Sequence, residues 1–356
     1  MRPILYLPWL MLVSTGDGGI YGAGQAVSLS CQAVVPPSDS GSGRIGVVAP
    51  GGNGVLAWTD GRPGQFLLRA SSGHTRIIGR SGAGPGEFRR LGGMGWIGDT
   101  LWVGDPIGAR VQFFSDTGRL LRVRTALPLV DWGARPDGRV IGFGLVQVAD
   151  PPLPIVVLAH RTGSTSADTV FTFPRPQTAR VLVPVGGREV PIPHPLVADI
   201  EVGASPDRGR FCAATPTGST AIRLLCVDDH GRSVLDRPLA LSPRPVTDSI
   251  YNGVIDLFAR APGRTAAAMR DRISRPQNLP PVLALLVDDG GEVWLARSHR
   301  FESTSRWLRL RSNGSVRDTV VFPGKYRIVR LQRDTVWIAI PDLDDLETMS
   351  RCTIKA

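Results

Sequence analysis

Residues 79–123 read GRSGAGPGEFRRLGGMGWIGDTLWVGDPIGARVQFFSDTGRLLRV, a stretch in which Gly, Asp and Arg separate short apolar runs. It holds short runs of β-branched and aromatic residues, each ended by Gly or Asp. Such runs are typical of antiparallel strands joined by tight turns. The stretch therefore predicts consecutive strands at GGMGWIGD, TLWVGD, RVQFFSDTG and RLLRVRTA.

The same unit recurs along the chain, which is the signature of a repeat architecture. Units of four strands begin near residues 44, 92, 129, 198 and 282, and a last unit of three strands begins near residue 327. Four second strands carry a tryptophan, at Trp58, Trp102, Trp294 and Trp337. This rhythm predicts an all-β fold, a six-bladed β-propeller, in residues 27–356 as a single domain.

The last unit lacks one strand, and the ring needs it because a free sheet edge would otherwise be exposed. VSLSCQAVV, residues 27–35, precedes the first unit and is expected to complete the last blade. Cys31 would then lie beside Cys352, where the two could form a disulfide. Cys212 and Cys226 stand in adjacent strands of the fourth unit and could form a second one, although their register is open. Free buried thiols are the alternative for both pairs.

Residues 242–281 break the rhythm. Apolar residues at Ile250, Val254, Leu257 and Phe258 follow the spacing of an amphipathic helix. RTAAAMRDRI, residues 264–273, is also helical by propensity. We expect a short helical insertion between blades 4 and 5 that caps one face of the ring.

The run GRSGAGPGEF, followed by LWVGDPIGARVQFFSDTGRLL, resembles the NHL-repeat type of six-bladed propeller. The matching positions are Gly84, Pro85, Gly86, Glu87, Phe88, Val103, Asp105, Arg110, Phe114 and Gly118. The chain is still more similar to exported bacterial six-bladed propellers of uncharacterised function. The other units share the strand rhythm with degenerate motifs, so the resemblance implies a fold and carries no function.

The N-terminus predicts export. Arg2 precedes an apolar run from Pro3 to Val13, and Gly24-Gln25-Ala26 fits a cleavage site, so residues 1–26 are expected to form a signal peptide. A misassigned start or a short buried strand is the alternative. A lipoprotein anchor at Cys31 is disfavoured by Ser28, where such a motif usually has Leu. The mature protein is expected to be periplasmic or secreted, monomeric and without a transmembrane span.

The charge of the chain does not point to nucleic acid. The 356 residues carry a formal net charge of +10, but lysine occurs only at Lys325 and Lys355, and the arginines are scattered. A nucleic-acid patch would need a basic run or stripe, which the sequence lacks.

In a propeller, the loops that join second to third strands share one face with the loops that join successive blades. Mixed charge on that face suits a polar ligand or a peptide. Asp60, Asp105 and Asp342 recur at one blade position, where an Asp that caps its own turn is the stronger interpretation. The candidate ligand-binding residues are Asp60, Arg62, Asp105, Arg110, His299, Arg300, Glu302 and Asp342, and Asp150, Asp344 and Asp345 converge on the same face.

The sequence holds no ready catalytic or metal-binding motif. His299 is the best candidate for a general acid or base, because it alone among the histidines is expected on the channel face beside charged groups. No cofactor is predicted; calcium at the acidic run DLDDLE, residues 342–347, is a minor alternative to a solvated loop. GAGPGEF enters a strand and not a helix, so it does not predict a phosphate site.

These observations favour a noncatalytic, exported propeller that binds a protein, a peptide or a polar small molecule at the loop face around the channel. The alternative is a metal-dependent propeller hydrolase, lactonase or lyase with its site at the channel mouth. A third interpretation, nucleic-acid binding as in some NHL proteins, is opposed by export.

Overall fold

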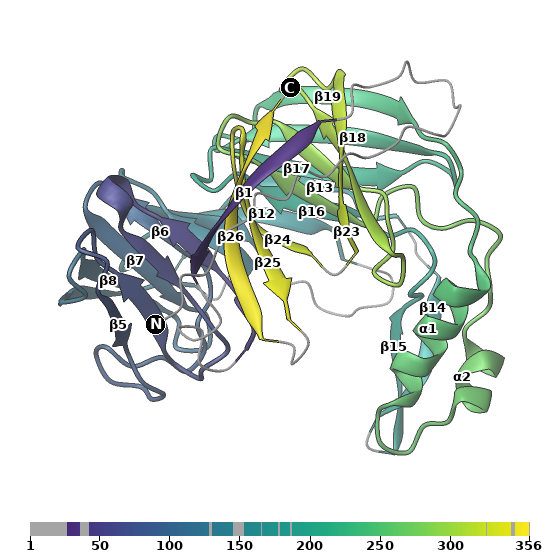
Figure 1. The fold of residues 1–356 in the computed structure, drawn as a ribbon, viewed down its shortest axis with the longest axis horizontal. Helices are drawn as coiled ribbons and strands as arrows, with labels where there is room; N and C mark the ends of the chain where they lie inside the picture. Colours follow the sequence, from purple (N-terminus) through teal and green to yellow (C-terminus); the bar gives the residue numbers. More distant parts are fainter. Residues whose placement is uncertain are drawn as a thin grey trace, which may run out of the picture.

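A computed structural model of the chain describes residues 27–35, 43–127, 130–144, 153–164, 166–176, 179–185, 187–324, 326–342 and 346–355. Six four-stranded antiparallel sheets form a six-bladed β-propeller (Figure 1). The predicted fold class is therefore confirmed. The expected signal peptide, residues 1–26, lies outside the described residues.

The first three blades follow each other in the sequence. Blade 1 comprises β2 (Val48–Pro50), β3 (Leu56–Trp58), β4 (Phe66–Arg69) and β5 (Thr75–Ile78). Blade 2 comprises β6 (Met94–Ile97), β7 (Thr100–Asp105), β8 (Arg110–Ser115) and β9 (Leu120–Thr125). Blade 3 comprises β10 (Val130–Ala134), β11 (Arg139–Phe143), β12 (Ile155–Arg161) and β13 (Asp168–Phe173).

The remaining blades complete the ring. Blade 4 comprises β16 (Glu201–Ala204), β17 (Arg210–Pro216), β18 (Ala221–Asp228) and β19 (Ser233–Ala240). Blade 5 comprises β20 (Ala284–Val287), β21 (Val293–Ala296), β22 (Thr304–Leu310) and β23 (Val316–Pro323). Blade 6 comprises β24 (Arg327–Gln332), β25 (Thr335–Pro341), β26 (Glu347–Lys355) and β1 (Ser28–Val35). The first strands of neighbouring blades contact each other, as β2 with β6 and β16 with β20 do, and so line the central channel.

The ring closes as predicted. β1 pairs antiparallel with β26 and places Cys31 directly opposite Cys352, and the two form a disulfide. Cys212 of β17 and Cys226 of β18 are also directly opposite each other and form the second disulfide. The first bridge joins residues 321 positions apart, whereas the second spans 14.

The run that resembles the NHL repeat seals the junction between blades 1 and 2. Phe88 packs edge-on against Phe66 of blade 1 and also contacts Phe114 of blade 2. Arg110 donates to the carbonyl of Glu87 over 2.8 Å and pairs with the buried Asp105 at 3.2 Å. The motif is therefore explained by blade packing.

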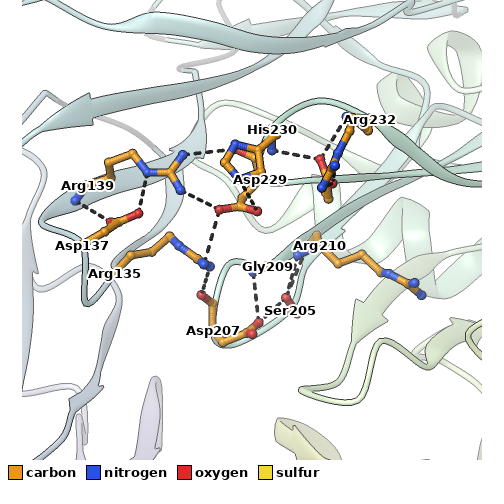
Figure 2. A network of polar contacts seen from close by, with 11 residues as sticks. Arg135, Asp137, Arg139, Ser205, Asp207, Gly209, Arg210, Asp229, His230 and Arg232 are labelled. Atoms are coloured by element: carbon orange, nitrogen blue, oxygen red, sulfur yellow. Dashed lines mark hydrogen bonds and ion pairs between the residues drawn. The ribbon is translucent and has the colours of Figure 1, made fainter.

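Arginines also link blades at the turns between first and second strands. Arg139 of blade 3 contacts Asp229, in the β18–β19 turn of blade 4, over 2.6 Å, and Arg135 reaches the same carboxylate over 3.3 Å (Figure 2). Arg210 occupies the corresponding position in blade 4 and donates to the carbonyl of Gly291 in blade 5. These contacts link blade 3 to blade 4 and blade 4 to blade 5.

The helical insertion within residues 242–281 is present as α1 (Asp248–Ala259) and α2 (Ala266–Arg272). Thr247 and Thr265 cap the two helices, since their hydroxyls accept hydrogen bonds from Ile250 N and Ala268 N. None of the helices in the described ranges is long and apolar enough to cross a bilayer.

The structure also holds a second insertion, between blades 3 and 4, which the sequence did not predict. It forms a hairpin of β14 (Arg180–Val185) and β15 (Arg188–Pro193). Val181 and Val183 of the hairpin share a buried cluster with Ile250, Val254 and Met269 of the helices. We call β14, β15, α1 and α2 the insertion module; Figure 1 shows it projecting to one side of the ring.

Candidate functional site

The insertion module stands on the loop face of the propeller. Its hairpin lies in the connection from blade 3 to blade 4, and its helices lie in the connection from blade 4 to blade 5. Both connections leave the ring on the face that also carries the loops between second and third strands. The module therefore belongs to the face where the sequence predicted a binding site.

The loop between β21 and β22 anchors the module to blade 5. Arg297 in this loop donates to the carbonyls of Ser242 and Pro281, which are the two ends of the helical insertion. Glu302 forms an ion pair with Arg244 at the entry to the insertion. This loop, which also carries His299, is thus shared by ring and module.

Close packing of α1 on the same loop explains a glycine in the helix. A Cβ at Gly253 would lie 2.7 Å from the ring of Phe301. A glycine in a helix interior costs about 1 kcal/mol relative to alanine, so its presence here reflects the close approach of the phenyl ring.

A pocket of about 650 Å³ opens where the module meets blades 4, 5 and 6. A pocket of this volume can hold a small molecule or one end of a peptide chain. Its walls come from the β15–β16 connection, the entry to β20, the β21–β22 loop, β22 and the start of β24. Lining residues with polar or aromatic side chains are His194, Asp199, Glu201, Ser298, His299, Arg300, Ser305, Trp307, Tyr326 and Arg327.

Glu201 is the first residue of β16 and lines the pocket. Two residues along the same strand, a Cβ at Gly203 would meet the carbonyl of Leu285 in β20, so this side of β16 faces blade 5. Alternation along the strand gives Glu201 the same side, towards the pocket. No donor among the described residues reaches its carboxyl, and burial, with a smaller contribution from Asp199, raises its pKa to about 8.

Asp199 has its own partner. The guanidinium of Arg175 forms two hydrogen bonds with the Asp199 carboxylate, one of them from Nε over 3.2 Å. The same carboxylate accepts from Ile200 N over 2.7 Å. The negative charge of Asp199 is therefore compensated, in contrast to that of an ionised Glu201.

His299 lies where the β21–β22 loop turns. Its backbone N donates to the carboxylate of Glu302, and its ring contacts that of Phe301 with centroids 5.2 Å apart. Burial, and less strongly the charge of Arg300, lowers its pKa, so the imidazole is neutral at pH 7. Its Nδ1 is buried and has no hydrogen-bond partner among the described residues.

Two arginines at the pocket differ in their pairing. Arg327 contacts the carboxylate of Glu347 over 2.8 Å and is thereby neutralised. Arg300 is exposed, lies over the ring of Phe301 at 5.1 Å, and forms no ion pair within the described part of the chain.

The structure separates the residues that the sequence analysis grouped on one rim. His299 and Arg300 line the pocket, whereas Glu302 does not line it and pairs with Arg244. The other five form local contacts in blades 1, 2 and 6: Asp60 with Arg62, Asp105 with Arg110, and Asp342 within its own turn. Asp150, Asp344 and Asp345 lie outside the described residues.

The aspartates cap their turns, as the stronger interpretation held. Asp60 accepts from Arg62 N, Asp105 from Gly108 N over 2.9 Å, and Asp342 from Leu346 N over 2.9 Å. In the ranges that the structure describes, no three His, Cys, Asp or Glu side chains are grouped so as to hold a metal ion.

The sequence analysis missed Glu201, Trp307 and Tyr326 as pocket residues. Glu201 carried one usable signal, because an acid in the short apolar inner strand of a blade, DIEVGA, has few places other than the channel mouth. Trp307 and Tyr326 carried none, because the pocket that they line forms only where segments far apart in the sequence meet.

Glu201 gives a stability prediction. Its pKa of about 8 in the fold exceeds the ordinary 4.5, so between these values the folded protein retains a proton that the unfolded chain loses. Stability therefore falls as pH rises through this window. Glu201→Gln removes this pH dependence. We expect the free energy of unfolding of the variant, compared with that of wild type, to be about 1–3 kcal/mol more favourable to the fold at pH 9 than at pH 4. Urea unfolding of both proteins at pH 4 and pH 9 measures this change. The same stability difference between variant and wild type at both pH values would contradict the prediction.

No family model and no curated protein sequence matches the chain. Solved structures do. A member of the DUF4221 family from Bacteroides vulgatus has a TM-score of 0.50 and 10% identity over 91% of this chain and 98% of its own. A putative exported protein from Bacteroides fragilis has a TM-score of 0.48 and 13% identity, over 96% and 98% of the two chains. Virginiamycin B lyase from Staphylococcus aureus has a TM-score of 0.44 and 10% identity, over 91% and 99%.

At these identities the likeness concerns the fold alone. The DUF4221 structure matches nearly the whole length of both chains, which agrees with a single complete ring. The site has to be argued from the side chains of this protein, because function resides in a site and not in a scaffold.

Proposed function

We propose that this protein is an exported binding protein that holds a small polar ligand, or one end of a peptide, in the pocket between the insertion module and blades 4–6. The observation that carries the proposal is the pocket itself, which is lined by the half-buried carboxyl of Glu201, a group without a partner among the described residues. Poorly solvated polar groups are normally hydrogen-bonded, so such a carboxyl in a pocket indicates a site that a ligand completes.

Export is supported by the covalent structure. Two disulfides account for all four cysteines, and such bridges persist in oxidising compartments. The predicted leader supports the same location. A ligand from outside the cytoplasm is therefore the kind expected.

The proposal is tested by filling the pocket. Val197 lies in its wall, and Val197→Trp would occupy the volume. Val185 is 49% exposed on β14 of the module, so Val185→Trp is a matched control away from the pocket. Thermal unfolding is followed with a panel of sugars, amino acids and short peptides at millimolar concentration.

We expect at least one compound to raise the Tm of wild type and of Val185→Trp by several degrees and to leave Val197→Trp unchanged. A compound at 100 times its Kd stabilises by about 2.7 kcal/mol, so the shift is measurable. Equal shifts in all three proteins would place binding elsewhere. Turnover of the bound compound in the presence of calcium would instead favour the enzyme alternative.

A further inference from the structure

Among the described residues, Glu201 is the carboxyl of the pocket wall that has neither a hydrogen-bond nor an ion-pair partner. Four other charged or titratable side chains of the wall have compensating contacts or are neutral. Asp199 pairs with Arg175, Arg327 pairs with Glu347, His194 bonds Leu196 N and the hydroxyl of Ser274, and His299 is neutral. Arg300 is exposed at the rim.

The wall beside blade 5 and blade 6 is aromatic. Trp307 is buried to all but 9% of its surface, and its indole N–H is satisfied by the hydroxyl of Ser305 over 2.9 Å. Its polar atom is thus occupied, and what it offers the pocket is apolar ring surface. Tyr326 adds a second aromatic ring at the start of blade 6.

We propose that the pocket recognises an organic cation, a primary ammonium group, which Glu201 binds while Trp307 and Tyr326 contact its alkyl part. This inference rests on the proposed function. An ammonium is the ligand that a half-buried carboxylate without a cation partner favours, and aromatic rings favour cations over anions. Where Glu201 is ionised, a neutral polar ligand would leave its charge uncompensated.

The arrangement makes binding depend on pH. Glu201 is mostly protonated at pH 6 because burial raises its pKa to about 8, and the cation binds its ionised form. The affinity for an ammonium therefore rises with pH until Glu201 is ionised and then levels off. The charge of Asp199 opposes the ionisation of Glu201, but Arg175 pairs with Asp199 and reduces this effect. The charge of Arg300 repels a bound cation, but Arg300 is exposed and solvent screens its charge.

The experiment uses three probes of one shape: n-butylammonium, 1-butanol and butyrate. Their binding to the full chain is measured by NMR titration at pH 6 and pH 8, where n-butylammonium keeps its charge. Glu201→Gln removes the carboxylate with little change of volume. Glu189→Gln is the matched control, because Glu189 lies on β15 and pairs with Arg272 outside the pocket.

We expect n-butylammonium to bind best, with an affinity at least tenfold higher at pH 8 than at pH 6. The affinity of Glu201→Gln for n-butylammonium should be at least tenfold lower than that of wild type at pH 8, and it should not depend on pH. The affinity of Glu189→Gln should match that of wild type. Preference for butyrate or 1-butanol, or unchanged binding by Glu201→Gln, overturns the cation assignment.

Failure of this inference is distinguishable from failure of the proposed function. If a sugar or acid shifts the Tm of wild type but not of Val197→Trp, and n-butylammonium does not bind, the pocket is a site and the cation assignment is wrong. If no compound distinguishes wild type from Val197→Trp, both proposals are wrong.

Discussion

Opening the ring by Cys31→Ser with Cys352→Ser is expected to lower the free energy of unfolding by about 5 kcal/mol, since in the chain-entropy model the cost grows with the length of the closed loop. The two cysteines are 321 residues apart, so the bridge restricts nearly the whole unfolded chain. The same bridge holds β1 against β26 and so completes blade 6. Urea unfolding under non-reducing conditions measures the loss.

The second disulfide is the matched control. Cys212 and Cys226 are 14 residues apart on neighbouring strands, and a loop of that length corresponds to about 3 kcal/mol in the same model. Cys212→Ser with Cys226→Ser should therefore cost less than the first pair. If the two double variants lose the same stability, the long bridge does not act by closing the ring.

Arg309 gives the second large effect. It is 0% exposed in β22 and contacts Glu292 at 3.1 Å and Asp318 at 3.4 Å, with its guanidinium 5.0 Å from the ring of Trp294. Arg309→Met keeps most of the volume but leaves two poorly solvated carboxylates without this cation. Loss of one partner of a buried ion pair costs about 3–5 kcal/mol of stability. We expect Arg309→Met to lower the free energy of unfolding, measured in urea, by an amount in this range.

Arg317 is the control within the same cluster. It contacts Glu292 and Asp334, but one third of its side chain is exposed. Exposed ion pairs contribute about 0–1 kcal/mol, so Arg317→Met should have a small effect. Similar losses in both variants would show that burial does not set the strength of these contacts.

The blades were predictable because their signals are local and repeated. Alternating apolar strands, glycine turns and the second-strand tryptophans recur in several units, and one missing strand in the last unit pointed to the N-terminal segment. The position of Cys31 beside Cys352 followed from that placement, whereas the register of Cys212 and Cys226 was open in the sequence and is given by the structure. The helices were found because Ile250 and Val254 keep a helical spacing.

The hairpin and the pocket were less predictable for a physical reason. β14 and β15 carry Pro184, Pro191 and Pro193, which argue against strands, and their apolar residues are buried only by contact with the helices that come much later in the chain. The pocket depends on that contact, because one wall follows the hairpin and another follows the helices. Residues such as Glu201 gain their role from this long-range packing.

We expect ligands to bind between the insertion module and blades 4–6, with Glu201 as the charged contact. The decisive measurement is a crystal structure of the protein grown with n-butylammonium at pH 8. We predict density for the ammonium nitrogen within about 3 Å of a Glu201 carboxylate oxygen, with the alkyl chain against Trp307. A probe bound elsewhere on the ring, with only solvent beside Glu201, would contradict the account.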